Sequence, residues 1–353
     1  MARLAADRVR EMEGRFDRLK TALNAGKPLD AALREDAHAL CAYMEGGLWL
    51  GDYERDERGE LPKDLKRGVL SQDALYDLLS VLDGRMKEDA RKGLRTMTKI
   101  QIIRGGETIA CAEALEEAQL LYRGEYLPGD EILFETDYEY AVVQVDQAVK
   151  PARVYLPQKA FAFRVPLSGD NLRVYMPGAF AGEKHLCSIR PDPDNSYRNL
   201  ARNPADQRGD VTCYPHATAN VETRDESVFC ARNTIDGEHI ACGHGSWPFG
   251  SWGIGARTDA EMTLDFGREV EVDKMVLYLR ADFPHDAYWI EGTVTLSDGA
   301  EITFPLEGID GPQEISLGAW HRIRSLKLHR LIKCDNPSAF PSLRQIEVYG
   351  RDI

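Results

Sequence analysis

Hydrophobic residues in the first 83 positions recur every three or four residues, the spacing that places them on one face of an α-helix. The segment Gly26-Lys27-Pro28 interrupts the pattern and predicts a turn between two antiparallel helices. A third helix is expected from Ser71, whose hydroxyl can cap free backbone amides. Between the second and third helices, Trp49 to Leu70 is expected to form a polar loop. The three buried stripes are Val9, Met12, Phe16, Leu19, Leu23; Leu29, Leu33, Ala37, Leu40, Met44; and Leu75, Leu78, Leu79, Leu82.

From Ile100 the pattern changes to short runs rich in β-branched and aromatic residues, separated by Gly and Pro turns. This pattern predicts a β-sandwich. The segment from Cys111 to Leu121 stays open between helix and strand, because its Ala and Glu residues favour a helix. The expected strands are Ile100–Arg104, Ile132–Glu135, Tyr140–Val145, Arg153–Leu156, Phe161–Val165 and Leu172–Met176.

A second β-rich region follows the segment Asn199-Leu200-Ala201-Arg202-Asn203-Pro204, and its strand pattern favours a second sandwich with a jelly-roll arrangement. The strands expected there are Glu261–Phe266, Lys274–Arg280, Trp289–Leu296, Glu301–Pro305, Glu314–Ser316, Arg324–Leu328 and Gln345–Tyr349.

These patterns divide the 353 residues into three domains and a linker, and a chain of this length is expected to have more than one domain. Residues 1–83 form a helical domain, 84–99 a polar helical tail or linker, 100–198 a middle β-sandwich and 199–353 a C-terminal β-sandwich. The boundary is expected near residue 97. The fold class is therefore multidomain α+β, with a helical domain followed by two β-sandwich domains.

Charge and composition narrow the classes of partner. The net charge of −14 lies almost wholly C-terminal to residue 99. An acidic body repels phosphate backbones, so nucleic acid is not an expected partner. Apolar runs fall short of the roughly 20 residues that span a bilayer, and charges occupy the place of a secretory signal. With seven scattered cysteines, these features predict a cytoplasmic protein that does not bind membranes.

Polar, aromatic and Gly-rich segments between Tyr214 and Trp289 predict a ligand site, because loops on a rigid sheet can present such side chains. Trp247 is the stronger candidate for a stacking platform, since Trp252 has a strong alternative as a core residue. The candidate ligand-binding residues are His216, Glu222, Arg224, His244, Trp247, Trp252, Arg280, Asp282, His285 and Asp286. The bland alternative for Arg280, Asp282, His285 and Asp286 is a hydrogen-bonded structural loop.

The N-terminal part resembles a small helical domain family of unknown function. The resemblance rests on Trp49-Leu50-Gly51-Asp52-Tyr53-Glu54, on Leu61-Pro62 and on the segment from Asp64 to Leu79. It implies no activity. Trp49 and Asp52 are expected to serve packing and turn formation, and the domain is expected to recruit or assemble with a protein partner.

The C-terminal part resembles the galactose-binding-like fold of discoidin-type and family 32 carbohydrate-binding modules. The resemblance rests on Asn233-Thr234-Ile235-Asp236-Gly237, Ser251-Trp252, Leu264-Asp265-Phe266-Gly267, Val272 to Arg280 and Ile346 to Gly350. It implies a jelly roll whose loops bind a sugar. It also implies a structural calcium ion at Asp236 and Glu347, whose oxygen ligands suit that ion. The alternative is that Asp236 is a turn residue and Glu347 a solvated strand residue.

The leading functional hypothesis is a carbohydrate- or glycoconjugate-binding protein with a loop-end pocket in the C-terminal jelly roll. A carbohydrate-active hydrolase is the first alternative, because the carboxylates and histidines of these loops are the groups that glycoside hydrolysis uses. An intracellular interaction scaffold is the second. Binding ranks above catalysis because HExxH, GxSxG and a Gly-rich phosphate loop are all missing from the sequence.

Overall fold

The structure is a computed structural model that describes residues 2–25, 27, 31–93, 97–209, 212–240, 243, 245–281 and 287–353. It divides into two compact units, Met1–Arg95 and Thr96–Ile353. The middle and C-terminal β regions therefore belong to one unit. Within the described ranges, none of the helices is long and apolar enough to cross a membrane.

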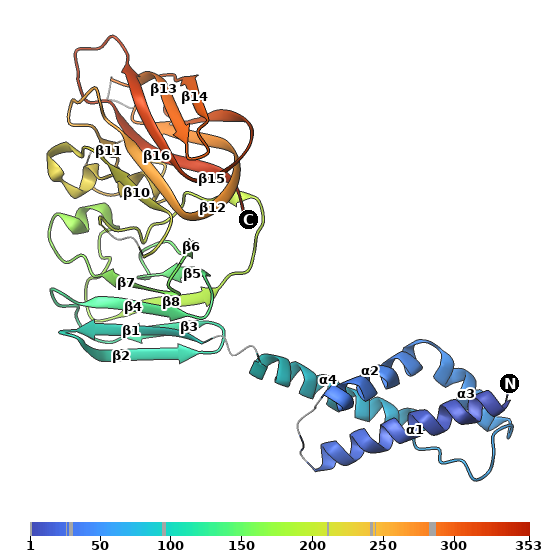
Figure 1. The fold of residues 1–353 in the computed structure, drawn as a ribbon. Helices are drawn as coiled ribbons and strands as arrows, with labels where there is room; N and C mark the ends of the chain where they lie inside the picture. Colours follow the sequence, from blue (N-terminus) through green and yellow to red (C-terminus); the bar gives the residue numbers. More distant parts are fainter. Residues whose placement is uncertain are drawn as a thin grey trace. The chain divides into compact units, whose positions relative to one another are not determined.

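In its described residues, the N-terminal unit contains four helices, α1 (Ala2–Asn24), α2 (Ala31–Glu45), α3 (Leu48–Glu57) and α4 (Gln72–Gly93) (Figure 1). The three predicted helices are confirmed, with the Ser71 hydroxyl 3.4 Å from the Ala74 amide. The prediction of a loop from Trp49 was wrong at its start. There α3 forms because Asp52 is wholly buried and accepts bonds from Arg8 and Tyr43.

Trp49 is the second residue of this unit that the sequence analysis singled out, and its role is packing. The Trp49 indole is buried and donates a 2.9 Å hydrogen bond to the Val69 carbonyl, which ties α3 to the turn before α4. Trp49 and Asp52 are thus structural, as expected. Residues 84–93, expected as a helical tail or linker, are the last turns of α4.

The middle region consists of two four-stranded antiparallel sheets. Five of the six expected strands are confirmed, but Leu172–Met176 was wrong, because a 3-10 helix, η1 (Asn171–Val174), lies there. The open segment Cys111 to Leu121 forms no helix: it contains the ends of two strands and the bend between them. One sheet has the order β2 (Glu107–Ala114), β1 (Thr98–Arg104), β4 (Glu131–Thr136), β7 (Ala160–Arg164); the other has β3 (Ala118–Tyr122), β8 (His185–Pro191), β5 (Tyr140–Gln144), β6 (Ala152–Tyr155).

The C-terminal region is built on one eight-stranded sheet. Its predicted strands are present, but two pairs of them merge into long strands, since β12 and β15 bend through register shifts without breaking. Trp252, Trp289 and Phe266 lie in its core. The strands are β9 (Arg198–Asn199), β10 (His216–Ala219), β11 (Trp252–Gly253), β12 (Met262–Leu279), β13 (Trp289–Leu296), β14 (Glu301–Pro305), β15 (Pro312–Lys333) and β16 (Ser342–Asp352).

Charged contacts join the two β regions around Asp352 at the end of β16. Its carboxylate is 2.6 Å from Arg153 of β6 and 2.5 Å from Arg268 of β12, and it also pairs with Arg198. Burial alone would raise the pKa of Asp352, but Arg268 and Arg198 outweigh it and hold the pKa below its ordinary value. The junction is therefore a closed, charge-paired contact.

Candidate functional site

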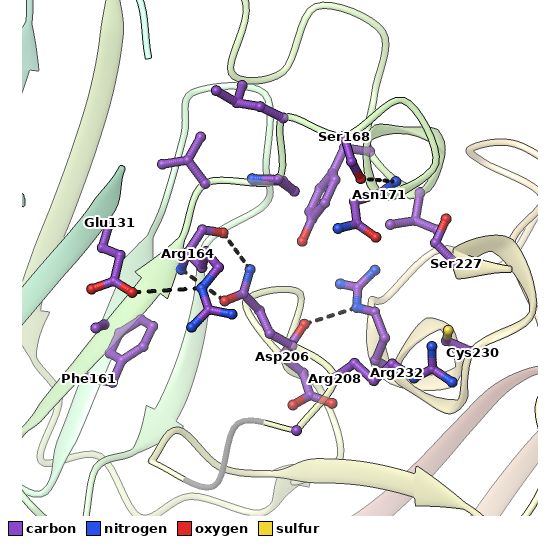
Figure 2. Close-up of a pocket in the computed structure, with 18 of the residues that line it drawn as sticks. Glu131, Phe161, Arg164, Ser168, Asn171, Asp206, Arg208, Ser227, Cys230 and Arg232 are labelled. Carbon is purple, nitrogen blue, oxygen red and sulfur yellow. Dashed lines mark hydrogen bonds and ion pairs between the residues drawn. The ribbon is translucent and has the colours of Figure 1, made fainter. Parts of the chain in front are cut away.

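A pocket of about 830 Å³ opens where the β7 end of the middle region faces the segment that leads into the C-terminal sheet. Figure 2 shows Glu131, Phe161 and Arg164 on one side and Ser227, Cys230 and Arg232 on the other. A volume of this size suits a small ligand of several rings. The pocket is the candidate functional site.

Strand β7 forms one wall and presents an open sheet edge. It pairs with β4 on one side, with Glu131 opposite Arg164 and Leu133 opposite Ala162. On the other side, the carboxamide of Gln207 accepts a 2.9 Å bond from the Arg164 amide and donates a 2.7 Å bond to its carbonyl. Backbone groups of alternate residues point the same way in an antiparallel strand. The N–H and C=O of Ala162 therefore point away from β4, on the edge that borders the pocket.

The opposite wall contains a buried guanidinium. Arg232 donates to the backbone oxygens of Asp206 and Pro204 at 3.0 and 2.9 Å, and lies 5.3 Å from the ring centre of Tyr175. It lies in the short 3-10 helix η4 (Ala231–Ile235), which is buried throughout. The cation is thus fixed by neutral oxygens and an aromatic face, which stabilises a charge at the pocket wall.

Asp206 lines the same wall, and its carboxylate is bonded to two residues of β10. Its Oδ1 lies 2.6 Å from Nδ1 of His216, and its Oδ2 accepts a 3.1 Å bond from the Ala217 amide. Burial raises the pKa of Asp206, although the bond to His216 opposes the shift. The pair anchors the loop that carries Gln207 onto β10.

The rim is held by ion pairs. Arg208 contacts Asp225 and lies 2.7 Å from Glu222, whose Oε1 accepts a 2.8 Å bond from the Ala231 amide. Nearby, burial and the proximity of Glu222 raise the pKa of the Cys230 thiol to about 12. Cys230 is therefore a protonated lining residue and not an activated nucleophile.

A second set of polar contacts closes the end of the pocket near η1. Asp170 accepts a 2.9 Å bond from the Ser227 amide and pairs with Arg173 at 3.3 Å. Arg173 also pairs with Glu226 at 3.1 Å. Among the described residues, the carboxylates that line the pocket (Glu131, Asp170, Asp206 and Asp225) thus all have partners.

Two predicted ligand residues lie in the core, and for them the prediction was wrong. The Trp252 ring is wholly buried, packs against Trp289 at 6.1 Å and donates a 2.8 Å bond to the Val221 carbonyl. Arg280 is 1% exposed and donates to the carbonyls of Phe249 and Gly243. Neither side chain is accessible to a ligand.

The remaining predicted residues lie around the pocket or away from it. His216 and Glu222 support it from behind, through Asp206 and Arg208. Arg224 is exposed and pairs with Glu226 at 2.7 Å. The half-buried Trp247 borders a smaller cavity of about 30 Å³, enough for a water molecule and too small for a sugar. His244, Asp282, His285 and Asp286 lie outside the described residues.

The expected calcium ligands are held by hydrogen-bond donors. Asp236 Oδ1 accepts a 2.6 Å bond from Gln345 and lies 3.4 Å from the buried Arg344 guanidinium. Glu347 instead accepts from Tyr349 and lies 3.0 Å from Nε2 of His239. A fixed cation beside Asp236 repels a second one, so this arrangement does not fit calcium. In the described part of the chain, no group of three or more His, Cys, Asp or Glu residues is placed to hold a metal ion.

Sequence reasoning missed most of the pocket. Gln207 and Arg208 follow a segment that was marked only as the start of a domain, and Arg232 directly precedes the motif from Asn233 to Gly237, which was used only for the fold resemblance. The available signal was Asn203-Pro204, a turn followed by closely spaced polar residues and Gly209. The β7 wall carries no signal of its own, because a sequence does not show which strand edge faces an open volume.

Three comparisons relate the chain to known proteins. Residues 9–89 match the model of a family described as a domain of unknown function, DUF4298. This confirms the expected helical family in the N-terminal part, which is less than half of the chain. No curated protein matches the chain.

Among solved structures, the C-terminal part is similar to carbohydrate-binding modules. A chitosan-binding module from a Paenibacillus sp. IK-5 chitosanase/glucanase is 18% identical, covering 43% of this chain and 99% of that one at a TM-score of 0.31. A family 32 module from C. perfringens, in complex with galactose, is 15% identical (38% and 91%, TM-score 0.29). A Streptococcus pneumoniae fucose-binding module is 15% identical (44% and 99%, TM-score 0.31). At these values the ligands named for those proteins do not pass to this chain.

Proposed function

We propose that this chain binds a carbohydrate or glycoconjugate in the pocket between β7 and Arg232. The observation that carries the proposal is the lining of the pocket. Half-buried apolar side chains such as Leu133 and Leu167 lie among amides, hydroxyls and paired charges. A sugar has an apolar C–H face and a ring of hydroxyls that both donate and accept, so it uses both kinds of surface at once.

The open edge of β7 adds directed hydrogen bonds. Gln207 shows that a planar amide fits this edge, since it bonds both the N–H and the C=O of Arg164. The backbone groups of Ala162, two residues earlier on the same edge, offer the same pair to a ligand. A sugar that carries an acetamido group has an amide that can bond to both the N–H and the C=O of Ala162.

Hydrolysis is the second candidate, and one observation favours it. Asp206 lines the pocket with a raised pKa, as a general acid requires. However, both of its oxygens are engaged by His216 and the Ala217 amide. Binding therefore ranks first.

The test is a calorimetric screen of mono- and oligosaccharides, with and without acetamido groups, on wild type and on Ala162→Trp. Ala162 is exposed on β7, so an indole there fills the pocket without disturbing the core. Ala181→Trp, at an exposed site outside the pocket lining, is the matched control.

We expect a Kd of about 1 mM or tighter, about 4 kcal/mol or more, in wild type and Ala181→Trp, and loss of binding in Ala162→Trp. Binding that survives in Ala162→Trp, or no binding to any of the sugars, overturns the proposal. Release of reducing ends from a bound oligosaccharide, abolished by Asp206→Asn, would establish the hydrolase instead.

A further inference from the structure

Trp320 differs from the other tryptophans of the chain in its exposure. It is 51% exposed, whereas Trp49, Trp252 and Trp289 are 7%, 0% and 1% exposed. Tryptophan is the largest aromatic side chain and is highly buried on average. Trp320 therefore offers an indole surface to solvent on the C-terminal sheet.

A bulge in the long strand β15 places Trp320 there. Val272 pairs with His321 and Lys274 pairs with Ser316, so the four residues 317–320 face the single residue Asp273 of β12. Gly318 has a φ of 82°, which lets the chain turn within the bulge. Bulges commonly re-aim a side chain, and this one directs a tryptophan to solvent.

Two tyrosines extend the surface. The Tyr197 ring lies 6.0 Å from the rings of both Trp320 and Tyr349; it is nearly perpendicular to the first (74°) and tilted by 30° to the second. Its hydroxyl donates a 2.7 Å bond to Oδ1 of Asp273, which fixes the ring. Three separate segments, the one before β9, the β15 bulge and β16, thus bring Tyr197, Trp320 and Tyr349 together. We call these three residues the aromatic shelf.

Two ion pairs lie around the shelf, together with the carboxylate of Asp273. Arg351 lies 5.2 Å from the Trp320 ring centre and pairs with Glu271 at 2.7 Å. Lys274 lies 4.7 Å from the Tyr349 ring centre and pairs with Glu314 at 3.4 Å. With both cations matched by carboxylates, the shelf has no excess positive charge for an acidic ligand. Arg351 and Lys274 lie over the Trp320 and Tyr349 rings, and Asp273 adds a carboxylate that is bonded to Tyr197.

We infer that the aromatic shelf is a second saccharide site, for neutral glycan chains. Sugar rings pack their C–H faces on flat aromatic rings and direct hydroxyls to charged side chains beside them. An open shelf suits the side of a chain, whereas the pocket encloses a short ligand. The inference rests on the sheet face alone and stands whether or not the pocket binds.

Tryptophan fluorescence tests the shelf directly, because Trp320 is the most exposed indole of the described residues. The probes are neutral hexasaccharides, one of β-1,4-linked glucose and one of β-1,4-linked N-acetylglucosamine. We expect at least one of them to protect Trp320 from acrylamide quenching at up to about 10 mM. By calorimetry, Trp320→Ala and Tyr197→Ala should weaken its binding about tenfold, and Trp320→Phe about threefold or less.

Ala162→Trp separates the two sites, since it blocks the pocket and leaves the shelf intact. Because this variant adds an indole, its hexasaccharide binding is measured by calorimetry, and that binding should persist. Failure of both hexasaccharides to protect Trp320 overturns the inference, as does unchanged affinity in Trp320→Ala. Protection without sugar that grows with protein concentration would make the shelf a contact between two copies of the chain, and would also overturn it. Circular dichroism of each variant checks that the sheet is intact.

Discussion

The two β regions of the second unit are joined at Asp352 and open at the pocket, and the charges at these places are arranged differently. At the junction, one buried carboxylate faces Arg153, Arg198 and Arg268. At the pocket, each lining carboxylate contacts a basic side chain, and Arg232 is held by neutral oxygens. The arrangement around Asp352 holds the two β regions together. The arrangement at the pocket keeps polar groups in place around an open volume, so that a ligand meets them already oriented.

Removing charge at the two places should therefore have unequal effects. Asp352→Asn leaves three arginines around a neutral group, and we expect it to lower the free energy of unfolding by about 3–5 kcal/mol. Asp225→Asn, at an exposed position on the pocket rim, should cost less than about 1 kcal/mol. Urea unfolding measures both. Equal losses would contradict the distinction between a fastened junction and an open pocket.

Low pH should weaken the ion pairs of the junction, because Asp352 becomes protonated. Because the pKa of Asp352 is held below its ordinary value of about 4, its stabilisation is fully present above that value and is lost as pH falls through the lowered pKa. Asp206, whose pKa is raised, has the opposite sign: its contribution is present at low pH and is lost as pH rises.

The measurement is urea unfolding of wild type and Asp352→Asn between about pH 3 and pH 7. The difference between the two proteins should be largest near neutrality and should shrink toward acid. A difference that is independent of pH would show that the Asp352 charge does not carry the effect.

Gln207→Ala tests the pocket side of the comparison. It removes two hydrogen bonds to the edge of β7, and we expect a loss of about 1–2 kcal/mol in the free energy of unfolding. Gln158→Ala is the control, because Gln158 is an exposed lining residue and should cost less than about 0.5 kcal/mol. Equal losses would mean that Gln207 does not hold the edge.

Calcium should have the smallest effect. With Arg344 and Gln345 on Asp236, we expect the melting temperature to shift by less than about 1 °C on adding calcium or a chelator. A rise of the melting temperature with calcium that disappears in Asp236→Asn would show that calcium binds at Asp236.

The sequence predicted the parts of the fold that depend on local pattern. Leu19, Leu40 and Leu75 point inward at helical spacing, and the alternation in β4 and β7 sets their buried faces. The sequence pattern did not show that α3 is a helix and not a loop. That helix is held by the bond between Asp52 and Arg8, which lie more than 40 positions apart.

The site was harder to predict for a related reason. A tryptophan beside a glycine is typical both of a sugar platform and of a packed core, and burial decided for the core at Trp252. Gln207 gains its role only from the backbone of Arg164, on a strand that the sequence does not place beside it. Trp320 was missed because a bulge, and not a loop motif, exposes it.

Hydrogen–deuterium exchange of the whole chain, with and without a saturating sugar from the calorimetric screen, tests the central claim most directly. The account predicts slower exchange of the amides of β7 from Ala160 to Arg164 and of the segment around Gln207 and Arg208. Protection confined to the loops near Trp247 and Gly253, with β7 unchanged, would contradict it and return the site to the end of the jelly roll.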